Sequence, residues 1–344
     1  SLVYNGEIYN FKELKNELIE KFNCKFLTTS DTEVVLKSFE YWGTDCFIKF
    51  DGMFALGIWD ESKKELILAR DKFGEKPLYY NEFKNDNKKQ ISFSSELNSL
   101  KYGPNFNKRL NKRSIKSYLI NNYTNSLETF YQDSYQIEPG TFLVFHKNVV
   151  KIKKYFSINE YFNKSKNYKK FDSVELDSII SKTVKSRMIS DVKLGVFLSG
   201  GLDSSIISYY AKNVNENISS FTLGFEEKSY DESSKSKLVS EHLGIKNINF
   251  TLEKKDLLEI ENIVLSFGQP LSDTSIIPTY YLSKFTKEHV KVCLSGDGGD
   301  ELFFGYDTYL ASNLYEILDK CNFNTILKFL NYIITTLPDN KNKI

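Results

Sequence analysis

The sequence predicts an antiparallel, layered α+β domain followed by an α/β domain built around a parallel sheet. Three observations lead to this prediction. The chain has 344 residues, which is more than one ordinary domain needs. Its first half contains short apolar runs that are separated by turn-like polar clusters. From about residue 173 onward, strand-like and helix-like segments alternate, as they do in a parallel sheet covered by helices.

The first domain is expected to contain short strands and two early helices. Residues 2–9 should form a strand that runs into a tight Asn-Gly turn. Apolar residues at helical spacing predict a helix over residues 11–22. Ser30 and Glu33 have the spacing of a capping box and predict the start of a second helix. The remaining strands are expected at residues 54–60, 65–71, 77–80, 91–94 and 141–146.

A stretch rich in Lys and Asn, residues 151–172, is expected to link the two domains. We therefore place the first domain at residues 1–155 and the second at residues 173–344. The second domain should open with a helix that ends near Met188, followed by a buried strand at 194–198. The alternation is expected to continue with helices near 204–212, 232–243, 254–266 and 277–288 and strands at 219–224, 247–251 and 290–294.

The composition argues against several classes of function. Lys and Arg number 46 and Asp and Glu 45, so the near-neutral charge argues against a nucleic acid or an anionic membrane surface as the main partner. No uncharged run approaches the roughly 18 residues of a membrane helix. The first ten residues carry Glu7 and no basic n-region, so we do not expect them to be a signal peptide. The 4 cysteines are far apart and there are only 3 histidines. We therefore expect neither a zinc cluster nor a disulfide framework, and a cytoplasmic location fits.

The strongest local signal is Leu-Ser-Gly-Gly-Leu-Asp-Ser-Ser at residues 198–205, which follows a buried strand and opens a helix. Glycines let the backbone approach an anion closely, and serine hydroxyls and the helix N-terminus add donors for phosphate. Asp203 is acidic in the middle of this anion site, which is explained if it binds Mg²⁺. The loop is neither a Walker A nor a GxGxxG motif. The alternative is a Ser/Gly-rich helix cap that binds no ligand.

A second signal, Ser-Gly-Asp-Gly-Gly-Asp-Glu at residues 295–301, again follows a strand. It should lie at the same edge of the sheet as Ser199, where open α/β sheets bind their ligands. Asp203 and Asp300 would then be able to share one hydrated Mg²⁺ between ATP phosphates. An acidic surface turn is the alternative, and the spacing does not fit an EF-hand.

Together these two segments resemble the synthetase domain of the asparagine synthetase family, within the ATP-pyrophosphatase (PP-loop) superfamily. The first half agrees independently. Five of its segments are similar to the class II glutamine amidotransferase domain of the same family, which has an Ntn-type fold: YNGEIYNFKEL (4–14), TSDTEVV (29–35), DGMFALGIWD (51–60), ARDKFGEKPLYY (69–80) and FSSELNSL (93–100). The resemblance covers nearly the whole chain, with the motifs in the family's order.

The resemblance implies a carbon–nitrogen ligase that works in two halves. The N-terminal domain would hydrolyse glutamine to glutamate and ammonia, which passes through an internal tunnel. The C-terminal domain would use ATP and Mg²⁺ to adenylate the side-chain carboxylate of aspartate and release pyrophosphate. Ammonia would then displace AMP and give asparagine. The adenylate converts a poor electrophile into a good one. A homodimer is one assembly that the resemblance allows.

For the glutamine site, the resemblance implies that Asn5 and Gly6 donate to the oxyanion, and that Asn5, Glu7 and Asp31 bind glutamine. Read by themselves, Asn5-Gly6 could be a turn and Asp31 a helix cap. The family's nucleophile is a cysteine ahead of the Asn-Gly-Glu motif. Since the chain begins with Ser and stops without a recognisable closing element, we expect it to be a fragment of a longer reading frame. Three residues of a neighbouring segment are expected to form structural ion pairs: Arg70, Asp71 and Lys76.

For the synthetase site, the resemblance implies that Asp203 and Asp300 bind the metal and that Asp297 lies near the reacting carboxylate. Tyr306 is expected either at the edge of the site or in the core. The residues implied to bind ATP are Leu198, Ser199, Gly200, Gly201, Asp203, Ser204, Ser205, Leu223, Ser295 and Gly296.

The acceptor is the least determined part of this interpretation. Residues 268–275 resemble a bacterial branch in which some members amidate carboxylates of sugars or peptides instead of free aspartate. The hypotheses are therefore an asparagine synthetase, or an amidotransferase for another carboxylate in surface polysaccharide or natural-product synthesis. A non-catalytic scaffold is the third, against which the retained Asp203 and Asp300 argue.

Overall fold

The computed structural model describes residues 1–124, 127–164, 172–229, 231–253 and 259–320. The chain divides into two compact units. The first consists of Ser1–Lys193, Leu223–Asp231 and Asn249–Val292. The second consists of Leu194–Thr222, Glu232–Ile248 and the described residues from Cys293 onward. The division passes through three strands of the C-terminal sheet.

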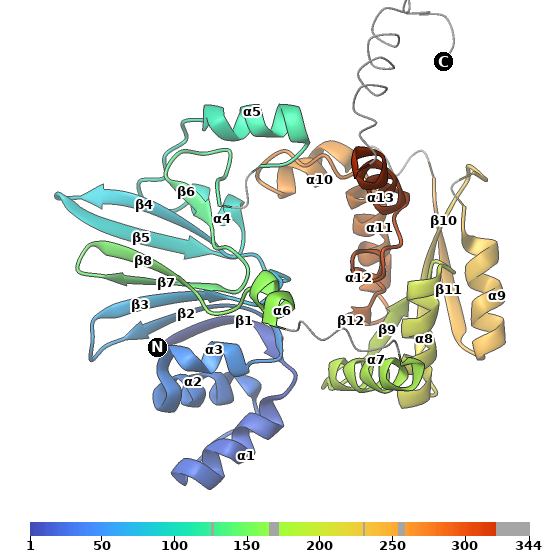
Figure 1. Cartoon of the computed structure of the whole chain (residues 1–344), viewed down its shortest axis with the longest axis horizontal. Coiled ribbons are helices and arrows are strands. Elements are labelled where there is room, and N and C mark those ends of the chain that lie inside the picture. Colours follow the sequence, from blue (N-terminus) through green and yellow to red (C-terminus); the bar gives the residue numbers. More distant parts are fainter. Residues whose placement is uncertain (125–126, 165–171, 230, 254–258, 321–344) are drawn as a thin grey trace, which may run out of the picture. The chain divides into compact units, whose positions relative to one another are not determined.

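The first unit contains two antiparallel sheets (Figure 1). The larger has the order β1-β2-β3-β7-β8 and the smaller the order β5-β4-β6. The strands of the larger sheet are β1 (Leu2–Ile8), β2 (Gly52–Asp60), β3 (Glu65–Arg70), β7 (Thr141–His146) and β8 (Val149–Lys154). Those of the smaller sheet are β4 (Tyr79–Asn85), β5 (Lys88–Ser94) and β6 (Ser134–Gln136). Since β1 is an edge strand, one side of its backbone is not paired with another strand.

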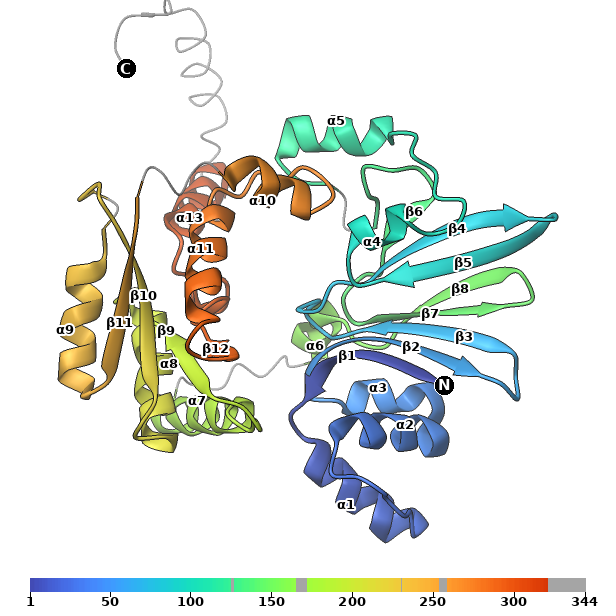
Figure 2. The same cartoon turned by 180° about the vertical axis from the view of Figure 1, so that it is seen from behind.

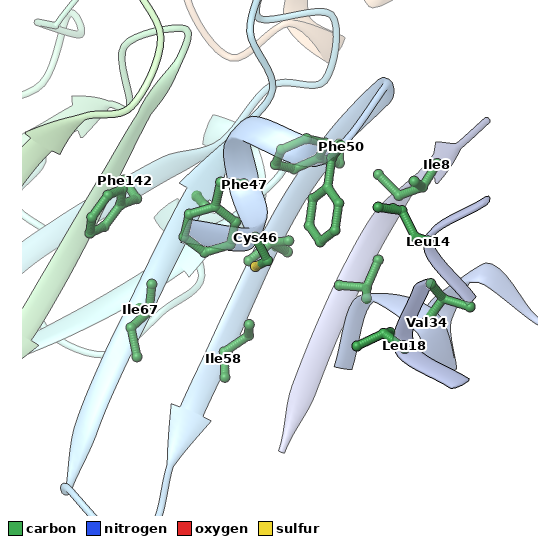
Figure 3. Close-up of a cluster of buried hydrophobic side chains, with 14 of the residues drawn as sticks. Ile8, Leu14, Leu18, Val34, Cys46, Phe47, Phe50, Ile58, Ile67 and Phe142 are labelled. Atoms are coloured by element: carbon green, nitrogen blue, oxygen red, sulfur yellow. The ribbon is translucent and has the colours of Figure 1, made fainter. Parts of the chain in front are cut away.

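Helices and the smaller sheet cover the two faces of the larger sheet. The helices of this layer are α1 (Phe11–Phe22), α2 (Asp31–Trp42) and α3 (Cys46–Lys49), the last preceded by a 3-10 turn at Gly43–Asp45. Buried side chains that include Leu18, Phe47 and Ile58 fill the space between helices and sheet (Figure 3). A second cluster, with Leu68 from β3 and Tyr80 from β4, fills the space between the sheets. Each such side chain contributes roughly 1.5–3 kcal/mol by leaving water.

Along the chain, the remaining helices of the first unit lie between β5 and β6, after β8, and within residues 249–292. They are α4 (Leu97–Lys101), α5 (Lys112–Asn121), α6 (Ile158–Lys164), α7 (Ser173–Arg187), α10 (Ile260–Ser266) and α11 (Ile276–Thr286). Ile263 of α10 and Tyr281 of α11 are buried in one small cluster with Leu252. No helix in the described part of the chain is long and apolar enough to cross a bilayer.

The C-terminal sheet has the order β11-β10-β9-β12, and β10 pairs with β9 in parallel. Its strands are β9 (Leu194–Phe197), β10 (Ser219–Phe225), β11 (Lys246–Leu252) and β12 (Val292–Leu294). The helices that alternate with them or follow them in the second unit are α8 (Leu202–Val214), α9 (Ser233–Leu243), α12 (Gly299–Phe303) and α13 (Asp307–Lys320). All four are labelled in Figure 1, and Figure 2 shows α8, α9 and α13 from the other side. The predicted succession of an antiparallel α+β half and a parallel α/β half is confirmed.

The predicted Asn-Gly turn is wrong. Asn5 and Gly6 lie in the middle of β1, where they pair with Ala55 and Phe54 of β2. The backbone of Met53 and Phe54 comes so close to Gly6 that a Cβ there would overlap it. Glycine is therefore required by close packing between strands and not by a turn.

Several boundaries also differ from the predictions. The expected linker begins with four residues of β8 and includes α6, while residues 165–171 lie outside the described residues. The strand expected at 290–294 shortens to Val292–Leu294. The helix predicted to begin at residue 254 is described from Ile260, because residues 254–258 lie outside the described part.

Candidate active sites

The open edge of β1 presents a backbone donor. In the β1–β2 pair, the Tyr9 N–H donates to the Asp51 carbonyl over 2.8 Å and the Trp59 N–H donates to the Ser1 carbonyl over 2.9 Å. Hydrogen bonds of an antiparallel pair alternate along the strand, so the odd-numbered residues of β1 bond to β2. The N–H of Gly6 therefore points away from β2, toward the open edge.

Asn5 and Glu7 lie on the same exposed face of β1, because side chains alternate along a strand. The Asn5 side-chain amide, Nδ2, donates a hydrogen bond to the Ser95 hydroxyl over 3.1 Å. Ser95 lies between β5 and α4, and the sequence pattern alone predicts no role for it. Nothing in the local sequence pairs the two residues, since the tertiary fold alone brings β1 and this segment together.

Asp31 is the first residue of α2 but does not cap it. The cap is Ser30, whose side chain accepts from the Thr32 N–H. Asp31 Oδ2 instead accepts from the Tyr4 hydroxyl at 2.8 Å and from the Ile8 N–H at 3.1 Å. The carboxylate is thus directed at β1, and the interpretation of Asp31 as a helix cap is wrong.

The capping box is only half formed. The Glu33 carboxylate accepts from the backbone N–H groups of Leu27 and Thr28, at 2.8 Å and 2.7 Å, and not from the N–H of Ser30. Backbone N–H groups of the preceding turn therefore donate to the Glu33 carboxylate, which the sequence spacing predicted to accept from the Ser30 N–H. The helix start was predicted correctly, although one of its two reciprocal bonds goes elsewhere.

The electrostatics of this region favour a cation. Partial burial, followed by the negative charge of Asp31, raises the pKa of Glu7, while the ammonium of Lys76 opposes the shift. Burial and the hydrogen bond to Asp31 raise the pKa of Tyr4, which therefore remains a protonated donor. The negative charge of Asp31 disfavours the ionised form of Glu7, and an ammonium group bound near both carboxylates would offset that repulsion.

The predicted ion pairs of Arg70 and Asp71 are not found among the residues that the structure describes. The buried Arg70 guanidinium donates to the carbonyls of Gly74, Lys76 and Ile137, at 2.6, 2.8 and 2.8 Å. The Asp71 carboxylate accepts from backbone N–H groups that include those of Phe73, Glu75 and Lys76. Buried charges need partners, and here the loop backbone supplies them. These side chains therefore shape the loop after β3.

In the second unit, the loop between β9 and α8 is folded tightly. Gly200 has φ +83°, and a Cβ there would lie 2.7 Å from the backbone of Lys235 and Ser236, so glycine is required on both counts. The Ser199 and Ser204 hydroxyls are 3.0 Å apart, and Ser199 Oγ accepts from the Gly201 N–H at 3.2 Å. Ser205 Oγ donates to the Gly201 carbonyl at 2.6 Å. The hydroxyls thus hold the loop in shape at the start of α8.

The two glycine-rich loops meet, as predicted. A Cβ on Gly296 would lie 2.7 Å from the Ser204 nitrogen and 2.9 Å from the backbone of Asp203, and Gly299 packs against the Asp203 carboxylate. The strands that precede these loops, β9 and β12, are neighbours in the sheet. Asp300 follows Gly299 directly, in the first turn of α12, and that turn packs against Asp203. The Ser295 hydroxyl donates to the Asp297 carboxylate over 2.9 Å.

Other predicted residues are placed differently. Leu198 is 1% exposed, and its N–H donates to the Phe221 carbonyl over 2.9 Å. Its carbonyl already accepts from the Thr222 hydroxyl at 2.7 Å. Leu223 belongs to the first unit, where it packs on the cluster around Ile263. Tyr306 is exposed, and its hydroxyl donates to Glu301 at 2.9 Å, so the interpretation as a core aromatic is wrong.

Two family models match the chain. A glutamine amidotransferase domain matches residues 1–156, and an asparagine synthase domain matches residues 175–326. The two matches follow each other in the chain order that the motifs predict.

Curated relatives agree with these matches. The asparagine synthetase [glutamine-hydrolyzing] 1 of Bacillus subtilis is 37% identical over 310 residues, which are 90% of this chain and 48% of that protein. A putative asparagine synthetase [glutamine-hydrolyzing] 2 of Methanocaldococcus jannaschii is 35% identical over 354 residues, 99% of this chain and 64% of that protein. A more distant relative, the amidase chry2 of Gibberella zeae, is 28% identical over 337 residues, 91% of this chain and 48% of that protein. The chain thus spans between 48% and 64% of the length of these relatives.

Proposed function

Because the chain belongs to the asparagine synthetase family, with a glutamine amidotransferase domain followed by an asparagine synthase domain, we propose that the protein is a glutamine-hydrolysing asparagine synthetase. Glutamine supplies ammonia, and ATP activates the β-carboxylate of aspartate as an acyl adenylate. Pyrophosphate leaves in the activation step. Ammonia then attacks the acyl carbon, AMP leaves with its bridging oxygen, and asparagine forms.

The observation that carries the proposal is the contact between the two glycine-rich loops. Gly296 lies against the backbone of Asp203 and Ser204, at the N-terminus of the 13-residue helix α8. Backbone donors and the positive end of a helix suit a phosphate chain. A helix cap without a ligand would need no second glycine-rich loop packed on it. This arrangement supports ATP as the ligand of the second unit.

Asp203 and Asp300 are the residues that would hold Mg²⁺. Carboxylate oxygens are the hard donors this ion prefers. In the ranges that the structure describes, no three His, Cys, Asp or Glu side chains come together as a metal site. Two carboxylates fit an ion that takes its remaining ligands from water and from substrate phosphates. When bound, the ion would neutralise charge on the phosphoryl oxygens.

The edge of β1 would serve the glutaminase reaction. The Asn5 amide and the Gly6 N–H are donors for the charge that develops on the glutamine carbonyl oxygen. Glu7 and Asp31 would bind the α-ammonium group of glutamine, whose positive charge relieves the repulsion between them. The backbone carries the Gly6 donor, so no side-chain motion is needed to present it.

We place the reaction in the cytoplasm. Cys24, Cys46 and Cys293 are thiols in the structure, and none forms a disulfide with another. Thiols that persist without pairing are typical of a reducing compartment.

Amidation of a carboxylate other than that of aspartate is a competing proposal. Residues 268–275 resemble the branch of the family that includes amidation of other carboxylates, and one relative is named an amidase. The activation chemistry is the same for any carboxylate, so the loops of the second unit do not select among them. The alternative is amidation of a sugar or peptide carboxylate.

Product analysis on the protein from the complete reading frame tests these proposals. We expect ATP, Mg²⁺ and ammonium to give AMP, pyrophosphate and asparagine only when aspartate is present. Asp203→Ala should abolish AMP formation because it removes a metal ligand. Glu216→Ala, which changes an exposed acidic residue beyond the C-terminus of α8, is the matched control and should leave the rate unchanged.

The products separate the hypotheses. AMP formation that ignores aspartate but responds to a sugar or peptide carboxylate would favour the competing proposal. ADP in place of AMP would contradict adenylation. Full activity of Asp203→Ala would contradict the metal assignment, and no nucleotide turnover at all would favour the scaffold hypothesis.

A further inference from the structure

The Asn5 amide is held by one side chain from a distant segment. Asn5 lies on the more exposed face of an edge strand, opposite the small side chain of Ala55 in β2. The terminal torsion of an asparagine is broad, so such an amide has several orientations of similar energy. The hydrogen bond from Asn5 Nδ2 to Ser95 Oγ, at 3.1 Å, favours one of them.

Ser95 is itself fixed on both sides. The residue before it, Ser94, pairs with Tyr79 at the end of β5, and its hydroxyl accepts from the Glu96 N–H at 3.2 Å. After it, α4 is anchored by Leu97 and Leu100, which are 1% and 3% exposed. A partner that is locked by its own neighbours can orient a functional group, whereas a mobile one cannot.

We propose that Ser95 positions the Asn5 amide for stabilisation of the oxyanion, an inference that rests on the proposed glutaminase reaction. An asparagine amide nitrogen carries two N–H donors. One is used by Ser95, and this bond directs the other toward the oxyanion beside the open-edge N–H of Gly6. Ser95 touches Asn5 and not the reacting atoms, so it is a positioning residue.

Steady-state kinetics of the protein from the complete reading frame test this role. Removing an entire oxyanion donor costs about 10²–10³-fold in kcat, so misorienting one should cost less, about tenfold. We expect Ser95→Ala to lower the glutaminase kcat by about tenfold with little change in KM for glutamine. Ser95→Thr keeps the hydroxyl and should restore most of the rate. Ser99→Ala, which removes an exposed serine hydroxyl of the adjoining helix α4, is the control and should leave kcat unchanged.

A double-mutant cycle separates positioning from a general structural effect. In an Asn5→Ala background, Ser95→Ala should cause no further loss, because the amide that it orients is gone. Amidation that uses free ammonium should be unaffected by Ser95→Ala. A wild-type kcat in Ser95→Ala, an undiminished effect in the Asn5→Ala background, or an equal loss of ammonium-dependent activity would overturn the inference. If wild-type protein releases no glutamate from glutamine, the proposed function itself fails.

Discussion

At the residue scale, the site on β1 depends on how one carboxylate is oriented. Asp31 Oδ2 accepts from the Tyr4 hydroxyl and the Ile8 N–H, at 2.8 and 3.1 Å. The other carboxylate oxygen, Oδ1, accepts from the Thr32 hydroxyl at 3.4 Å, which is long for a hydrogen bond between oxygens. The structure therefore fixes one oxygen and leaves the second able to accept from an ammonium group. Tyr4 is the residue on which this orientation depends most.

Replacing Tyr4 by Phe should weaken glutamine binding and leave the chemical step nearly intact. The change removes one donor to an ionised carboxylate, a loss of about 1.5–3 kcal/mol at a fully buried site. Asp31 is only partly buried and retains the Ile8 N–H, so we expect about 1 kcal/mol, which corresponds to a roughly fivefold higher KM for glutamine. The measurement is glutaminase kinetics with kcat and KM determined separately.

A matched control is available in the same unit. The Tyr155 hydroxyl donates to the Arg70 carbonyl over 2.7 Å, and it contacts none of the proposed glutamine-binding residues. Tyr155→Phe should therefore lower stability to a similar extent and leave KM for glutamine unchanged. If Tyr4→Phe changed kcat but not KM, Tyr4 would act on the reacting atoms and the assignment of Asp31 to the ammonium group would be wrong.

At the element scale, the second unit brings its chemistry together at the ends of two neighbouring strands. β9 leads into the loop before α8, and β12 leads into the loop before α12. Glycine at position 296 permits the loop after β12 to touch the first turn of α8, because the backbone of Asp203 and Ser204 occupies the space that a Cβ would need. The side chains that would bind ATP and metal are placed by this backbone contact.

Gly296→Ala tests the contact directly. The added methyl group would lie 2.7 Å from the Ser204 nitrogen, and the neighbouring atoms are backbone that cannot move aside easily. We expect the loops to separate and the adenylation rate to fall by at least 10²-fold, since about 1 Å of misplacement has costs of that order. Glutamate release, measured on the same sample, is the internal control and should remain within about twofold. A variant with an unchanged adenylation rate would show that the loops need not touch.

The sequence was sufficient to predict the elements whose signals are local. The helix over residues 11–22 and the strands around the Ser199 loop follow from apolar spacing and from glycine after a buried strand. Asn5-Gly6 misled the prediction, because a glycine needed for close strand packing has the same local signature as a turn. The Asn5–Ser95 bond was beyond prediction, since it joins residues that only the tertiary fold brings together. The sequence predicted charged partners for Arg70 and Asp71. Their actual partners are backbone groups, which every residue carries, so the identity of the neighbouring side chains could not predict them.

At the scale of the whole molecule, the proposed function joins two reactions in one chain. The first unit would release ammonia at the edge of β1, and the second would form an adenylate at the ends of β9 and β12. Ammonia has no use unless the carboxylate is already activated, so adenylation is the central step. Analysis of the products therefore identifies both the acceptor and the molecule to which its carboxylate oxygen is transferred.

The most direct measurement follows ¹⁸O from the acceptor carboxylate. The protein from the complete reading frame would be given ATP, Mg²⁺, glutamine and aspartate labelled with ¹⁸O in both β-carboxylate oxygens, and the nucleotide products analysed by mass spectrometry. Adenylation predicts that each asparagine formed transfers one ¹⁸O to AMP and none to pyrophosphate, because a carboxylate oxygen becomes the bridging oxygen of the adenylate. AMP without ¹⁸O, or ¹⁸O in inorganic phosphate with ADP as the other product, would contradict it.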